Sequence, residues 1–244
     1  MSVLAPILAA TPIARVEDAV ARMNAIAEVL PAADGIACFN KLYLEVTKSV
    51  LASLGQATFA DPAFLTALDV NFANLYFGAL SAFEAGSPAT PRAWAPLFEA
   101  RGSQTIAPLQ FALAGMNAHI NRDLPVALLQ TFTATGLGPS GDSPEHADFE
   151  RVNTLLAATE KQVKEDYLDG LTRTLDARFD GVDDVVAIWS VTAARDAAWT
   201  NGEVMWHLRG VGPVADAYLA ALDRTVGFAA RGLLVSTGTL ARVA

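Results

Sequence analysis

The predicted fold depends most on one segment, Phe111-Ala-Leu-Ala-Gly-Met-Asn-Ala-His-Ile-Asn-Arg-Asp-Leu-Pro125. It begins with an apolar run, Phe111-Ala-Leu-Ala-Gly-Met116, and residues 103–121 contain no Asp, Glu, Lys or Arg. These features predict a central core helix over roughly 105–133. Pro125 lacks a backbone N–H, so we expect it to kink this helix.

Helical periodicity continues on both sides of this segment. Apolar residues recur every three or four positions over 16–30 and again over 36–54, and Asp61-Pro62 is typical of the start of a third helix reaching about 85. A short helix is expected over 91–101. Beyond the central helix, further helices are expected over about 144–175, from Asp183 or Asp184 to about 210, and from Pro213 to 234. No segment alternates as a strand does. The sequence therefore predicts an all-α bundle of about seven or eight helices.

The clearest loop, over residues 136–144, could divide two domains. The helices on either side of it are too apolar to stand alone. We therefore expect a single helical domain over residues 1–244.

Composition narrows the classes of protein to consider. Hydrophobic residues make up 52% and charged residues 18%, with a mean hydropathy of +0.32. Polar residues or Pro and Gly interrupt the apolar stretches 103–121 and 124–141, so we expect core helices and no membrane insertion. The net charge of −9 argues against nucleic acid as a partner. A single cysteine, and an N-terminus without a basic region, favour a cytoplasmic protein. The apolar content also permits a buried homodimer interface.

The central helix carries a polar cluster in apolar surroundings. His119 and Asp123 are four residues apart and share one helix face, so they could bind a metal or act as a His–carboxylate pair in acid–base chemistry. Asn117 and Asn121 form a second pair on another side of the helix, for packing or for hydrogen bonds to a substrate. The alternative is a buried structural network in which Arg122 or Arg195 neutralises Asp123.

A second carboxylate–His pair, Glu203 and His207, lies in another predicted helix. Two helices that each supply such a pair could build a metal site for Zn²⁺ or Mn²⁺, although di-metal bundle proteins space Glu and His three apart. Solvent exposure of Glu203 and His207 is the alternative. With no redox motif in the chain, the first hypothesis is a metal-dependent hydrolase centred on His119 and Asp123.

The second hypothesis is a metal-free protein that binds a small apolar or amphipathic molecule, or cyclises or isomerises one. His119 and Asp123 would then act as an acid–base pair in an aromatic cavity. The residues expected to line this cavity are Asn40, Tyr43, Asp69, Phe72, Tyr76, Trp94, Arg195 and Trp199. A third hypothesis is a non-catalytic interaction protein.

The run Ala114-Gly-Met-Asn-Ala-His-Ile-Asn-Arg-Asp-Leu-Pro125 resembles the signature of a bacterial, chiefly actinobacterial, family whose function is unknown. Similar features are Asp34-Gly35 followed by Phe39-Asn40 and Tyr43, the stretch 68–76, and Arg195 with Trp199. The resemblance spans most of the chain and implies a helical domain of about this length. It marks Asn117, His119, Asn121 and Asp123 as a site and implies no activity.

Overall fold

The computed structural model describes residues 2–9, 12–54, 59–154, 156 and 190–236. Every regular element in these ranges is helical, which confirms the predicted all-α class. Predictions for residues 157–189, including the helix start at Asp183 or Asp184, lie outside the described residues.

The first half of the chain follows the sequence prediction closely. Helices α2 (Val16–Val29), α3 (Gly35–Leu54) and α4 (Pro62–Glu84) begin and end near the expected positions. The side chain of Asp61 caps α4 by accepting a hydrogen bond from the backbone of Phe64. The short helix α5 (Ala95–Ala100) is also present, whereas α1 (Ala5–Leu8) was not predicted.

The central helix consists of three parts. Helix α6 (Pro108–Ala118) leads into a π-helical turn, η1 (His119–Asp123), which continues as α7 (Leu124–Thr135). The backbone N–H of Leu124 donates to the carbonyl of His119, five residues back. Pro125 lies two residues after the end of this widened turn, and a proline ring would clash with the carbonyl four residues before it in a regular α-helix. The turn therefore accommodates the proline, and π-turns occur frequently at functional sites.

The C-terminal helices differ in one respect from the prediction. Residues 144–154 are helical, α10 covers Val191–Leu208 and α11 covers Gly212–Leu233. Ser190 has an extended backbone and caps α10, since its hydroxyl accepts a hydrogen bond from the backbone of Ala193. The expectation of one unbroken helix from 183 to 210 is therefore wrong at Ser190.

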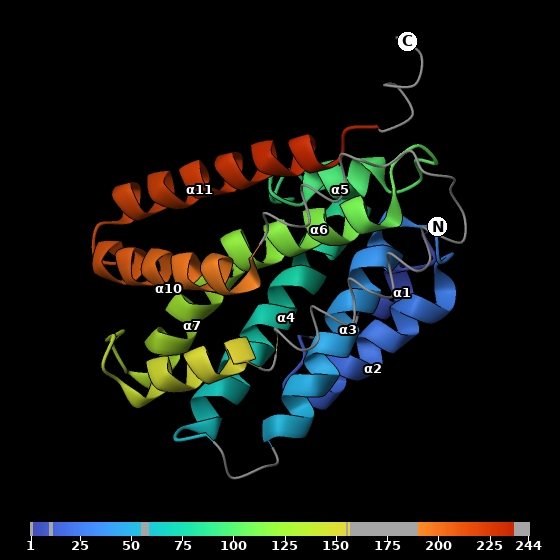
Figure 1. The fold of residues 1–244 in the computed structure, drawn as a ribbon. Coiled ribbons are helices and arrows are strands. Elements are labelled where there is room, and N and C mark those ends of the chain that lie inside the picture. The colour runs from blue at the N-terminus through green and yellow to red at the C-terminus, as the bar shows by residue number, and fades with distance from the viewer. Residues whose placement is uncertain (1, 10–11, 55–58, 155, 157–189, 237–244) are drawn as a thin grey trace.

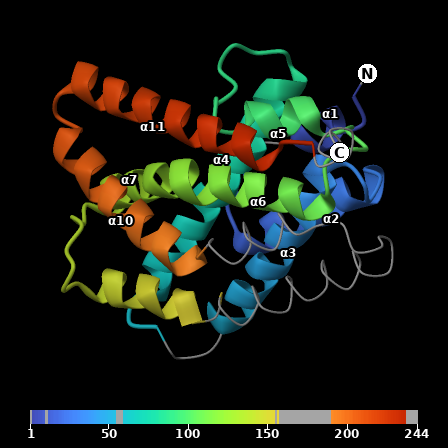
Figure 2. The same ribbon diagram turned by 45° about the horizontal axis from the view of Figure 1, so that its top comes forward.

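The central helix is surrounded by other helices on several sides. Helix α6 packs against α3 and α11, α7 packs against α4 and α10, and η1 contacts α4, α10 and α11. In both ribbon views α11 runs beside α6 (Figures 1 and 2). Two apolar clusters form the core, and Phe72 and Met116 pack against both of them. The polar turn η1 therefore lies in the interior.

Helix α4 is long and apolar enough to cross a membrane, as judged by length and composition alone. Its buried residues, among them Phe64, Leu68 and Tyr76, belong to the two core clusters. Core packing therefore accounts for its apolar composition, and the absence of membrane insertion stays a prediction.

Candidate functional site

His119 lies in an aromatic environment at the start of η1. Only 2% of the residue is exposed. The ring of Phe72, from α4, stacks on the imidazole with 3.5 Å between centroids and 6° between planes. Tyr43, from α3, meets the imidazole edge-on at 4.4 Å. Three helices thus fix the position of the ring.

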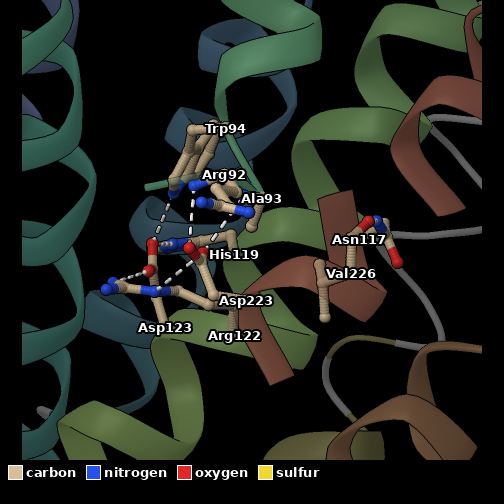
Figure 3. Close-up of polar contacts among 9 residues, drawn as sticks. All are labelled: Arg92, Ala93, Trp94, Asn117, His119, Arg122, Asp123, Asp223 and Val226. Carbon is tan, nitrogen blue, oxygen red and sulfur yellow. Dashed lines mark hydrogen bonds and ion pairs between the residues drawn. The ribbon is translucent and has the colours of Figure 1, made fainter. Parts of the chain in front are cut away.

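Asp123, at the end of the same turn, collects three hydrogen bonds. It is fully buried, and its carboxylate accepts from the indole N–H of Trp94 at 2.9 Å and from Arg122 at 2.7 Å. The third partner is Nδ1 of His119, at 3.2 Å. Figure 3 shows the three side chains converging on the carboxylate. The predicted His119–Asp123 contact is therefore present, and Arg122 rather than Arg195 neutralises the carboxylate.

Asp223, on α11, contacts Arg122 and the backbone just before Trp94, and both of these residues hold the Asp123 carboxylate. Its carboxylate accepts hydrogen bonds from the backbone N–H groups of Arg92 and Ala93, and it lies 3.6 Å from Nε of Arg122. The segment just before Trp94 is thereby tied to α11 (Figure 3). Sequence reasoning missed Asp223, because its partners lie about 100 or more positions away and leave no local signal.

The hydrogen bond between His119 and Asp123 indicates which ring nitrogen carries the proton. Nδ1 faces a carboxylate, which can only accept, so Nδ1 is the donor and Nε2 has the lone pair. Nε2 is buried and has no hydrogen-bonding partner among the described residues. Burial lowers the pKa of His119, and the hydrogen bond to Asp123 offsets this only in part. The imidazole is therefore neutral at pH 7, with a free basic nitrogen.

A cavity of about 90 Å³ lies beside His119. Its walls come from α3, α4, the central helix and the first turn of α10, with Val152 and Leu156 adding further apolar surface. Most of the lining is Leu, Val, Ile and Phe. The polar and ionisable members of the wall are Tyr43, Thr47, Asp69, His119 and Arg195.

Asp69 and Arg195 are the ionisable partners of His119 in this wall. Asp69 is half-buried, and its Oδ2 is buried with no hydrogen-bonding partner among the described residues. Burial raises the pKa of Asp69 to about 7, partly offset by Arg195. Burial also lowers the pKa of Arg195 to about 10, although Asp69 and other carboxylates oppose this.

Four residues that the sequence predicts in the cavity wall do not line the cavity found in the described part of the structure. Asn40 donates a hydrogen bond to the carbonyl of Met23, and Trp94 binds Asp123. The ring of Tyr76 packs edge-on against the imidazole, with 6.2 Å between centroids, and is not among the cavity-lining residues. Trp199 packs against aromatic residues of the second core cluster. Tyr43, Phe72, Asp69 and Arg195 do line the cavity, as expected.

The second polar pair of the central helix is used for packing. The side-chain amide of Asn121 donates to the side-chain oxygen of Asn117 at 3.0 Å. Asn117 in turn donates to the carbonyl of Val226 on α11, away from the His119–Asp123 contact (Figure 3). Neither asparagine lines the cavity within the described part of the chain.

The Glu203–His207 pair does not join His119 and Asp123. Glu203 accepts a hydrogen bond from the indole of Trp199, and His207 is exposed. Within the described ranges, no three or more His, Cys, Asp or Glu residues come together in a group that could hold a metal ion. The predicted four-ligand set is therefore not assembled by these residues.

Comparison with known proteins gives a family without a known activity. A family model described as a family of unknown function, DUF5995, matches residues 16–236. No curated protein and no solved structure matches the chain.

Proposed function

The chain belongs to the DUF5995 family of unknown function, and we propose from its own geometry that it is an isomerase-type enzyme acting on a small apolar molecule. The substrate would occupy the cavity beside His119, and the reaction would move a proton on it. One observation carries the proposal. The buried Nε2 of His119 has no partner among the described residues, while Nδ1 is held by Asp123.

The chemistry follows from the roles of the two ring nitrogens. Nε2 accepts a proton from a C–H group of the substrate next to a carbonyl, and the imidazole becomes an imidazolium. The Asp123 carboxylate, 3.2 Å from Nδ1, stabilises this cation and keeps the ring in the productive tautomer. Nε2 then returns a proton to a different atom of the substrate, so no co-reactant is needed. Exchange of the Nε2 proton with solvent before this return would place deuterium on the substrate in D₂O.

The surroundings of the ring suit a base that works at neutral pH. The stacked Phe72 ring and the edge of Tyr43 restrict its rotation, so Nε2 keeps one direction. Because burial holds the pKa of His119 below 6.5, the base is unprotonated before the substrate arrives. Trp94 and Arg122 also hold Asp123, which fixes the carboxylate against the imidazole.

The metal-dependent hydrolase hypothesis has less support. Both carboxylate oxygens of Asp123 already accept hydrogen bonds, from Arg122 on one side and from Trp94 and His119 on the other. Among the described residues, Glu203 and His207 supply no further ligands to this position. A bound Zn²⁺ or Mn²⁺ stays a prediction, as do the cytoplasmic location and the actinobacterial range of the family signature.

Proton–deuterium exchange tests the proposal with simple carbonyl compounds in place of the natural substrate. Purified protein in D₂O would be mixed with 2-butanone, 2-pentanone or butanal, and the loss of the proton beside the carbonyl would be followed by NMR. We expect the wild-type protein to accelerate exchange of at least one compound. His119→Gln should lower the rate by about 100-fold or more, the usual contribution of a positioned base.

His207→Gln is the matched control, because this histidine is exposed on α10 and should leave the rate unchanged. The wild-type rate should decline only below pH 6.5, where His119 begins to accept a proton. No acceleration by the wild-type protein, or full exchange by a folded His119→Gln variant, would overturn the proposal. Full exchange by the folded variant would mean that the His119–Asp123 pair has only a structural role.

A further inference from the structure

We infer that Arg195 and Asp69 form a carboxylate-binding subsite in the cavity, so that the molecule bound beside His119 is a small apolar monocarboxylic acid. This inference rests on the proposed function for its substrate, and it adds the group by which that substrate is recognised. Three observations support it: the partners of Arg195, the unpaired oxygen of Asp69, and the apolar character of the remaining wall.

Arg195 is a buried cation with uncharged partners. Only 6% of the residue is exposed. Its guanidinium donates to the side-chain oxygen of Asn153 and to the carbonyl of Phe149, and it lies 4.0 Å from the centroid of the Phe149 ring. Among the described residues no carboxylate forms an ion pair with it. A buried guanidinium normally has an anionic partner. The guanidinium has five N–H donors, and its described hydrogen bonds use only two of its three nitrogens. Arg195 therefore has capacity for one more acceptor, and a carboxylate is the acceptor that fits its planar fork best.

Asp69 reaches the same wall from α4, one helical turn before Phe72. It lies close enough to Arg195 for each to shift the pKa of the other, yet the two form no ion pair among the described contacts. Its Oδ2 remains without a hydrogen-bonding partner in this part of the structure. With a pKa raised to about 7, Asp69 can hold a proton near neutral pH and donate it to an incoming oxygen.

These two side chains together present a cation and an O–H donor to the cavity. A ligand carboxylate would accept from both, and its negative charge would favour the protonated form of Asp69. An ammonium group would instead need ionised Asp69 and would lie near the Arg195 cation. The other lining residues, such as Leu42, Val50 and Leu113, offer only apolar contact to the rest of the ligand. The charge arrangement thus favours an acid over an amine.

Calorimetric titration with matched short-chain compounds tests this inference. Butanoate and hexanoate would be compared with 1-butanol, 1-hexanol and butylamine at pH 6 and pH 8. We expect the acids to bind at least about tenfold more tightly than the alcohols, and butylamine not to bind. Binding of the acids should be weaker at pH 8, and titrations in buffers of different ionisation enthalpy should show proton uptake at that pH.

Two variants separate the roles of the side chains. Arg195→Gln should lose the preference for acids over alcohols. Asp69→Asn keeps a donor and removes the titrating group, so it should still bind the acids but lose the pH dependence and the proton uptake. Arg209→Gln is the matched control, since it removes the same charge from an exposed position at the end of α10. If Arg195→Gln does not fold, Asp69→Asn alone still tests the inference.

Preference for butylamine or the alcohols, or loss of acid binding in Asp69→Asn, would overturn the carboxylate subsite. The two proposals also fail separately. Acid binding that depends on Arg195, without accelerated exchange of any of the three carbonyl compounds, would refute the isomerase proposal and leave the subsite. Exchange that depends on His119, without acid binding, would refute only the subsite.

Discussion

Replacement of Asp123 by Asn tests whether the buried network around His119 holds the central turn together. The amide oxygen of Asn can still accept from Trp94 and His119. Its NH₂ group would then face the guanidinium of Arg122, whose nitrogen now lies 2.7 Å from Oδ1 of Asp123. A donor would meet a donor, and of the carboxylates in the described ranges Arg122 would retain only Asp223, at 3.6 Å.

The size of this effect follows from the burial of the two groups. Removal of one partner from a buried ion pair typically costs about 3–5 kcal/mol. Because the Arg122 side chain is 14% exposed and Asp223 remains nearby, we take the lower end, about 3 kcal/mol. For a chain of this length that corresponds to a fall in Tm of about 6–12 °C. Urea unfolding, monitored by circular dichroism, would measure the change in the free energy of unfolding as a shift of the unfolding midpoint at constant m-value.

Glu203→Gln is the matched control for Asp123→Asn. Glu203 also accepts a hydrogen bond from an indole N–H, that of Trp199, at 2.9 Å, but it is half-buried and forms no ion pair with a described residue. We expect this change to cost about 1 kcal/mol or less. If Asp123→Asn is no more destabilising than Glu203→Gln, the ion pair with Arg122 does not stabilise the turn and our account of the network is wrong.

Two further changes test the packing and the electrostatics of the structure. In Gly227→Ala the new Cβ would lie 2.3 Å from the backbone oxygen of Arg92, so we expect a loss of about 1–3 kcal/mol in urea unfolding. The control is Gly78→Ala, in mid-helix, where a new Cβ would have nothing within 4 Å, and this change should stabilise the protein by about 0.5–1 kcal/mol. Equal effects at the two sites would contradict the close approach of α11 to the backbone of Arg92. Asp69→Asn should gain stability relative to the wild type as the pH rises from about 4 to about 7, because the unfolded carboxyl ionises near 3.8 whereas the folded one keeps its proton to about pH 7. The full shift corresponds to at most about 4 kcal/mol. A stability difference that does not change with pH would show that Asp69 is not desolvated.

The sequence by itself determined most of the described helices and one contact of the candidate site. Apolar spacing and the Asp61-Pro62 cap are local signals, so α2, α3 and α4 could be placed almost to the residue. The contact between His119 and Asp123 was equally accessible, because residues four apart on a helix share a face. The sequence therefore predicted this side-chain contact correctly, and its functional role stays a proposal.

Only the tertiary structure decided which other residues surround His119 and Asp123 in the candidate site. Trp94, Asp69 and Arg195 come from three other parts of the chain, and the sequence could not show that the indole would bind Asp123 while Arg195 would line the cavity with Asp69. Asp223 and Arg122 lie about 100 positions apart. Side-chain pairing over such separations depends on how the helices pack, which leaves no periodic trace in the sequence. Helical spacing fixes which residues share a face of one helix, and packing alone fixes which faces meet.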